Sequence, residues 1–223
     1  MTTLSLEPMD LAALLCSRVC HDLISPIGAI ANGLEVLDDE KDASMRDFAI
    51  DLIRKSAAGA AAKLKFCRLA YGAAGSAGAT IDTGDAEAVA RGLLVNEKVS
   101  IQWNGARQLL AKNKVKLLLN LAQIAANSVP RGGVVTVEIS GEADATVLKV
   151  TAKGTNAKMQ PRFADLIAGK AEGGAVDGHT IQPYYAGLVA RESGLAIEIV
   201  SEQDSLIFLA RPNVTAPTEI NAA

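Results

Sequence analysis

Apolar residues recur at steps of three and four through the N-terminal part of the chain. The first stripe comprises Ala12, Leu15, Val19, Leu23, Ile27, Ile30, Leu34 and Leu37. The second comprises Ile50, Ile53, Ala57, Ala60, Leu64, Cys67 and Tyr71. A charged run over residues 38–42 separates the two stripes. This spacing is typical of amphipathic helices, so residues 8–74 are predicted to form a helical hairpin.

A hairpin of this length has two apolar stripes and cannot cover both of them by itself. Two hairpins that associate form a four-helix bundle, so the sequence predicts a homodimer built on these helices. The small residues over 57–62 would let a partner helix approach closely.

After residue 79 the pattern changes to short alternating helices and strands. Helices are predicted over 85–96, 112–128 and 182–193 and near 161–168, and strands over 80–83, 99–103, 134–140, 146–152, 195–201 and 206–211. The fold class is therefore α+β, with an N-terminal helical hairpin followed by a C-terminal α/β sandwich. The predicted division is a hairpin over 1–75, a Gly- and Ala-rich linker over 76–79, a second domain over 80–212 and a disordered tail over 213–223.

Composition narrows the possible functions. Of 223 residues, 49% are hydrophobic but 4% are aromatic, so Ala, Leu, Val and Ile must build the core. A net charge of −3 argues against nucleic acid as a partner. Three cysteines without metal-ligand spacing fit a reducing cytoplasm. We expect no signal peptide, and no membrane span because Arg18, His21 and Asp22 interrupt the first apolar stretch.

His21 is one of two histidines in the chain and lies in the middle of the first predicted helix. At 100° per residue it is about 200° around the helix from Val19, opposite the apolar stripe and facing solvent. Uncharged side chains surround it on that face: Leu14, Ser17, Ser25, Gly28 and Asn32. An exposed imidazole on such a surface predicts a docking site for a partner protein.

Three neighbours of His21 favour a chemical role. The carboxylate of Asp22 can hold the tautomer of the imidazole and take up a proton. Arg18, one helical turn earlier, could meet a phosphoryl oxygen. Pro26 lacks a backbone N–H, so the helix loses one hydrogen bond. This loss destabilises the helix, which suggests that the proline has a function near His21. The alternative, a surface histidine of no consequence, stays open on these grounds alone.

Residues 21–26 read His-Asp-Leu-Ile-Ser-Pro and are similar to the H-box of sensor histidine kinases. In that family the motif lies on the first helix of a dimeric two-helix hairpin, and the histidine is phosphorylated. The resemblance implies that His21 is the phospho-acceptor and that Asp22 is its acid/base neighbour.

Residues 120–133 are similar to the N-box region of GHKL (Bergerat) ATPase domains, but three nucleotide contacts of that family are missing. Ile124 stands where the family has an Asn that binds magnesium. Ala152 stands at the adenine-binding Asp, and Asn156 at a Gly of the same box. Residues 179–185 replace the Gly-rich box that cradles phosphate. We therefore expect a degenerate ATPase domain without a nucleotide or metal site.

A histidine-kinase-like dimer with a degenerate ATPase domain resembles the ChpT-type histidine phosphotransferases. The resemblance implies phosphate transfer from the receiver of a hybrid kinase (CckA-like) to His21, and onward to response regulators of the CtrA and CpdR kind. It implies no cofactor in this chain, with magnesium supplied by the receiver. Two alternatives remain: an active ATP-dependent histidine kinase and a non-catalytic adaptor that binds receivers. His179 is expected to be a loop histidine without a catalytic role.

Overall fold

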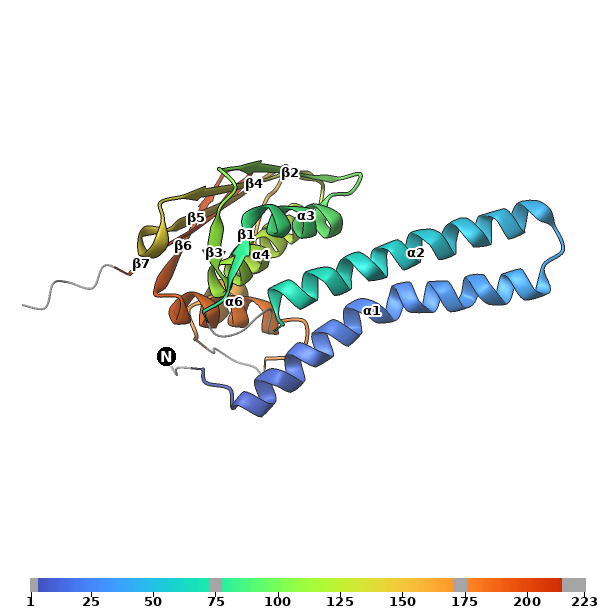
Figure 1. Ribbon diagram of the computed structural model, residues 1–223, viewed down its shortest axis with the longest axis horizontal. Helices are drawn as coiled ribbons and strands as arrows, with labels where there is room; N and C mark the ends of the chain where they lie inside the picture. Colours follow the sequence, from blue (N-terminus) through green and yellow to red (C-terminus); the bar gives the residue numbers. More distant parts are fainter. Residues whose placement is uncertain (1–3, 73–77, 171–175, 214–223) are drawn as a thin grey trace, which may run out of the picture.

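A computed structural model describes residues 4–72, 78–170 and 176–213. Helices α1 (Pro8–Asp39) and α2 (Ala43–Ala70) form a hairpin that extends away from the rest of the molecule (Figure 1). Pro8 begins α1 at a position where its missing N–H costs no hydrogen bond. The carboxylate of Asp42 begins α2 by accepting hydrogen bonds from the backbone N–H groups of Ser44 and Met45. The predicted hairpin is confirmed.

The two helices of the hairpin approach each other closely at Gly33. A Cβ atom added at Gly33 would lie 2.6 Å from Cγ1 of Ile53 and 3.4 Å from the carbonyl oxygen of Ala49. A side chain at this position would therefore displace Ile53 from its place between the helices. Ile53 packs inside the hairpin here, because its side chain fills the space beside the glycine.

The C-terminal domain is a helix layer packed on a mixed sheet. Its elements are β1 (Thr80–Asp82), α3 (Thr83–Leu94), β2 (Val99–Asn104), β3 (Leu109–Ala111), α4 (Lys112–Asn127), β4 (Gly133–Ser140), η1 (Ala143–Ala145), β5 (Val147–Lys153), α5 (Pro161–Ile167), α6 (Ile181–Glu192), β6 (Leu195–Glu202) and β7 (Ser205–Pro212). The large sheet has the order β2-β4-β5-β7-β6, with β2 parallel to β4 and the other pairs antiparallel. A separate two-stranded sheet joins β1 and β3.

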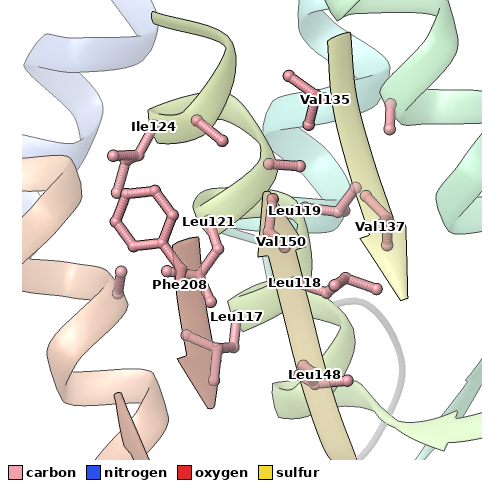
Figure 2. Close-up of a cluster of buried hydrophobic side chains, with 14 of the residues drawn as sticks. Leu117, Leu118, Leu119, Leu121, Ile124, Val135, Val137, Leu148, Val150 and Phe208 are labelled. Atoms are coloured by element: carbon pink, nitrogen blue, oxygen red, sulfur yellow. The ribbon is translucent and has the colours of Figure 1, made fainter. Parts of the chain in front are cut away.

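Alternate residues of the central strands point toward the helices and form the core. The register places Val137 beside Val150 and Val150 beside Phe208, so one continuous apolar face crosses β4, β5 and β7. Helix α4 covers this face with Leu117, Leu118, Leu121 and Ile124 (Figure 2). The predicted α+β class, a helical hairpin followed by an α/β sandwich, is confirmed.

The structure differs from the sequence prediction at strand β3 and at Thr83. Strand β3 was not predicted, because three residues are too few to show a period, and it forms by pairing with β1. Thr83, predicted as the end of a strand, begins α3 instead. The reason is that the carboxylate of Asp82 accepts a hydrogen bond from the N–H of Gly84 and ends the strand there.

The segment before α1 is joined to the C-terminal domain by two hydrogen bonds. The N–H of Leu4 donates to the carbonyl of Gly169 at 2.8 Å, and the N–H of Leu6 donates to the hydroxyl of Tyr184. Of the linker predicted over 76–79, residues 76 and 77 lie outside the described residues. Of the tail predicted over 213–223, Asn213 alone is described, and its N–H donates to the carbonyl of Gly194.

Candidate functional site

His21 lies in the middle of α1 with its side chain 58% exposed, as the helical spacing predicts. Its Nδ1 atom is 3.5 Å from Oδ1 of Asp22. The Nε2 atom is at the opposite side of the imidazole from Nδ1, so it does not share the contact with Asp22. This arrangement leaves Nε2 as the ring nitrogen available to react with another molecule.

Asp22 is held between two side chains of its own helix. Its Oδ2 accepts a hydrogen bond from Nε of Arg18 at 2.9 Å, one helical turn away, while Oδ1 faces His21. The Arg18 side chain is 14% exposed and the Asp22 side chain 20% exposed, so water screens this ion pair less than a fully exposed pair. Arg18 therefore orients Asp22, and its predicted contact with a phosphoryl oxygen stays a prediction.

Pro26 weakens α1 next to the site, and α2 compensates for it. Proline has no N–H, so the carbonyl oxygen of Asp22, four residues earlier, loses its helical donor. Nζ of Lys63 on α2 lies 2.8 Å from that oxygen and donates to it. The hydrogen bond also ties α2 to the helical turn that carries His21. Lys63 was missed in the sequence, although the free carbonyl that a helical proline creates was a signal for such a donor.

The C-terminal domain brings a second histidine to the site. The rings of His21 and His179 have centroids 4.4 Å apart and an interplanar angle of 78°, an edge-to-face contact. Nη1 of Arg18 lies 3.4 Å from the carbonyl oxygen of His179. The loop position of His179 agrees with the prediction. Its contact with His21 has no signal in the sequence, because it depends on how the domains pack.

Packing of the C-terminal domain against α1 covers part of the surface predicted for partner binding and leaves the rest exposed. Ser25, Gly28 and Asn32 are exposed, and Ser17 is exposed beside Gly178. Leu14 was predicted to face solvent, and this is wrong: it is half-buried against a cluster formed by Leu166, Val176, Ile181 and Tyr184. The physical reason is that α6 and the segment before it cover this end of α1. The binding role of the remaining residues stays a prediction.

Two of the positions that correspond to nucleotide contacts, Ile124 and Ala152, lie inside the core, while Asn156 is exposed. Ile124 is 1% exposed and Ala152 is 0% exposed. Asn156 adopts φ of 62°, the left-handed conformation that suits the glycine it replaces. Residues 181–185, in place of the phosphate-cradling glycines, form the buried first turns of α6.

Asn120, the residue of the N-box that this chain retains, has a structural role. Its Nδ2 donates to the carbonyls of Lys116 and Ala70, which links α4 to the end of α2. Its Oδ1 accepts from Nε2 of Gln182 on α6 at 3.4 Å, and that same nitrogen donates to Oε1 of Gln123. These amides therefore bond to each other, and they join the hairpin, α4 and α6.

Cys67 lies on α2 near the same group of charges, yet it is a poor nucleophile at neutral pH. Burial raises the pKa of its thiol to about 11, with a smaller contribution from the Asp22 carboxylate. The thiol is therefore protonated at neutral pH, and the thiolate is the nucleophilic form. Among the described residues, no group of three or more His, Cys, Asp or Glu side chains is placed to hold a metal ion.

Comparison with known proteins agrees with this arrangement. Residues 83–205 match the family model of the histidine phosphotransferase C-terminal domain. The protein phosphotransferase ChpT of Brucella abortus (strain 2308) is 47% identical over 206 residues, which are 92% of this chain and 97% of that protein. A solved bacterial phosphotransferase matches with a TM-score of 0.86 at 44% identity, over 95% of this chain and 100% of that one.

A more remote match is the histidine kinase domain of the blue-light-activated histidine kinase of Erythrobacter litoralis, with 13% identity and a TM-score of 0.46 over 82% of this chain and 94% of that one. The close matches define a class: a histidine phosphotransferase of two-component signalling, built here from a helical hairpin and a C-terminal α/β domain. The chain belongs to the ChpT-type histidine phosphotransferases.

Proposed function

We propose that His21 accepts phosphate from the aspartate of a receiver domain and passes it on to the aspartate of another receiver. The observation that carries the proposal is the exposed imidazole of His21, whose Nδ1 faces an Asp22 that Arg18 holds in place. Such a pair favours the tautomer with the proton on Nδ1, which leaves the lone pair of Nε2 free to attack.

The transfer step follows from this geometry. The Nε2 lone pair forms the N–P bond while the P–O bond to the receiver aspartate breaks, and the electron pair leaves with the carboxylate. Positive charge develops on the imidazole, and Asp22 stabilises the proton held on Nδ1. The reverse step returns the phosphoryl group to a carboxylate, so one site serves both the donor and the acceptor.

The magnesium ion for this step comes from the receiver in our proposal. Magnesium prefers oxygen ligands, usually one or two carboxylates together with phosphate oxygens. Asp22 is the acidic side chain that contacts His21, and its two oxygens already face Arg18 and His21. The chain itself therefore acts without a bound cofactor.

ATP has no part in the proposed reaction. Burial of Ile124 and Ala152 supports this, since both side chains contribute to the apolar core where the ATPase family places polar contacts. The start of α6, where that family has its Gly-rich box, is buried as well. The C-terminal domain is then a degenerate ATPase domain that serves as a scaffold. The rival function, an active histidine kinase, requires magnesium-dependent ATP binding.

The proposed partners are a second copy of the chain, the receiver of a hybrid kinase (CckA-like) and response regulators of the CtrA and CpdR kind, which control the cell cycle. The homodimer is supported by large apolar side chains that stay exposed on the hairpin: Met9, Ile24, Ile27, Leu34, Met45, Phe48 and Leu64. Apart from the nearby backbone of α2 itself, no atom of the described residues lies within 4 Å of a Cβ atom added at Gly59, so a partner helix has room there. The signalling partners rest on the similarity to ChpT.

We place the protein in the cytoplasm, without nucleic acid or membrane as a partner. By length and composition α1 could cross a membrane. Against that role, Arg18 and Asp22 form an ion pair in the middle of α1, and Lys63 reaches α1 from α2. The first turns of α1 also pack against the C-terminal domain through Leu11 and Leu15. These contacts favour a hairpin that packs against protein.

The test is a transfer assay with a receiver domain charged by radiolabelled acetyl phosphate. The unmodified protein should take up acid-labile label, while His21→Gln, which keeps the polarity and the fold, should take up none. A non-catalytic adaptor would bind the receiver but take no label in either form. Calorimetry with ATP and magnesium tests the kinase alternative: micromolar affinity would overturn the proposal that ATP has no part.

A further inference from the structure

We propose that His179 is a positioning residue for phosphoryl transfer: its ring holds the imidazole of His21 in the orientation that reacts. The inference rests on the proposed role of His21. The starting observation is the edge-to-face contact between His179 of the C-terminal domain and His21 of the hairpin, with ring centroids 4.4 Å apart.

An exposed histidine side chain on a helix can adopt several ring orientations. A phospho-acceptor has to be held in the orientation that reacts. The side chain of His21 is 58% exposed, and Asp22 faces its Nδ1 from 3.5 Å, a distance longer than a hydrogen bond. This contact alone is too weak to fix the ring. His179 adds a contact on the ring itself, which narrows the orientations of the imidazole before a receiver arrives. Attack on phosphorus depends steeply on such alignment.

The loop that carries His179 has its own internal structure. Oδ1 of Asp177 accepts hydrogen bonds from the N–H of His179 at 3.0 Å, the N–H of Thr180 at 2.8 Å and the hydroxyl of Thr180 at 2.7 Å. These bonds hold the pKa of the Asp177 carboxyl below its usual value, first of all through the Thr180 hydroxyl. The loop therefore keeps its shape at neutral pH.

Both ends of this loop are anchored. Val176 before it is 9% exposed and Ile181 after it is 0% exposed, and both belong to the apolar cluster that packs against the start of α1. The loop then lies against α1 itself. A Cβ atom added at Gly178 would lie 3.1 Å from Oγ of Ser17, a tight contact that shows how closely the loop approaches α1. Arg18 completes the contact through the carbonyl oxygen of His179.

Arg18 thus contacts both groups that orient His21. Its Nε holds Asp22, and its Nη1 reaches the backbone of His179. The two partners approach the imidazole from different parts of the structure: Asp22 from α1 and His179 from the C-terminal domain. A domain that has lost its nucleotide contacts then still contributes to the reaction, because it supplies this ring.

The test compares His179→Ala with His179→Phe in the full-length protein. Phenylalanine keeps an edge-to-face contact but has no ring nitrogen, so it isolates the role of the ring. With a receiver charged by acetyl phosphate, His179→Ala should lower the maximal transfer rate about threefold to tenfold, the range expected for loss of one aromatic pair. The receiver concentration at half-maximal rate should not change. His179→Phe should restore the rate to within about twofold of the unmodified protein.

A second readout follows the orientation directly. The chain has two histidines, so a histidine-labelled NMR spectrum contains two imidazoles. The ring current of the neighbouring ring should shift the carbon-bound ring-proton resonances of His21 in the unmodified protein and in His179→Phe, and this shift should disappear in His179→Ala. Glu202→Ala, an exposed change in the hairpin between β6 and β7, is the control and should alter neither readout.

Two results would overturn the inference while leaving the proposed function intact. One is an unchanged maximal rate in His179→Ala, when His21→Gln takes up no label. The other is a rate in His179→Phe as low as in His179→Ala, which would show that the ring contact is not what matters. Label on His21→Gln would instead overturn the proposed function, and this inference with it.

Discussion

Nζ of Lys63 lies 2.8 Å from the carbonyl oxygen of Asp22, the oxygen that Pro26 leaves without a helical donor. A proline inside a helix normally costs about 3 kcal/mol or more. Here the lost hydrogen bond is replaced by one from the second helix of the hairpin. The site gains a connection between α1 and α2 at the turn that carries His21.

The replacement predicts a coupling between Lys63 and Pro26. Lys63→Met should lower the free energy of unfolding by about 1–2 kcal/mol, because it leaves the Asp22 carbonyl without its charged donor. In a Pro26→Ala background the restored N–H satisfies that carbonyl, and the cost of Lys63→Met should fall by about 1 kcal/mol. Urea unfolding at fixed protein concentration measures the cycle.

Lys65→Met is the matched control for this cycle. Lys65 is an exposed lysine two residues further along α2, and its substitution should have the same small effect in both backgrounds. Strict additivity of Lys63→Met and Pro26→Ala would contradict the compensation.

A second prediction concerns Asp22. Asp22→Asn keeps the size of the side chain but removes the negative charge that stabilises the Nδ1 proton. Transfer should slow, by at most the 10²–10⁴-fold typical of a lost acid/base partner, while receiver binding stays unchanged. Rapid-quench kinetics give the rate, and calorimetry gives the affinity. Asp10→Asn, an exposed change in the first turn of α1, should leave both unchanged. Transfer at the original rate would show that Asp22 has no part in the chemistry.

The hairpin predicts a third result, on the oligomeric state. Phe48 is 64% exposed and Ile27 is 53% exposed, so each gains burial from a partner hairpin. Phe48→Glu combined with Ile27→Glu should give a folded monomer in light scattering. Ile53 is unsuitable for this test, since it packs against Gly33 within one hairpin and its substitution would damage the fold. A stable monomer of the unmodified protein at micromolar concentration would exclude the homodimer.

A fourth prediction follows from the pKa of Cys67. With Cys16→Ser and Cys20→Ser, Cys67 is the remaining thiol. Its pKa of about 11 against an ordinary 9.0 makes the thiolate about 100-fold scarcer at pH 8 in the folded protein. Alkylation by iodoacetamide should be slower by at least that factor than in urea. Equal rates would show that the thiol is not buried.

The same shift sets the sign of a pH effect on stability. The folded state holds the Cys67 proton more tightly than the unfolded state does. This contribution to stability is fully present below pH 9.0 and is lost as the pH rises toward about 11. Cys67→Ala should reduce the loss of stability over that range.

The sequence predicted what depends on local pattern. The hairpin, the alternation of helices and strands and the exposure of His21 follow from residue spacing, because each reflects the period of one element. Strand β3 and the contact of His179 with His21 depend on how distant segments pack, and no local period encodes them. Leu14 is a further example. Its position on the helix predicted exposure to solvent, but residues of α6 and of the segment before it pack against it.

The resemblance to known motifs added what the pattern could not. Residues 21–26 marked His21 among the exposed positions of α1, and the missing contacts at Ile124 and Ala152 indicated a degenerate ATPase domain. The structure adds a physical reason for the apolar residues at these two positions. A carboxylate or carboxamide there would be buried among apolar side chains, which would destabilise the folded protein.

The most direct test of the account is to locate the phosphate. The protein is charged by a phosphorylated receiver, kept at neutral to alkaline pH to preserve phosphohistidine, and digested for tandem mass spectrometry. The account predicts phosphate on the peptide that contains His21, and an uncharged protein when the same experiment uses His21→Gln. Phosphate on His179, or phosphate retained in His21→Gln, would contradict it.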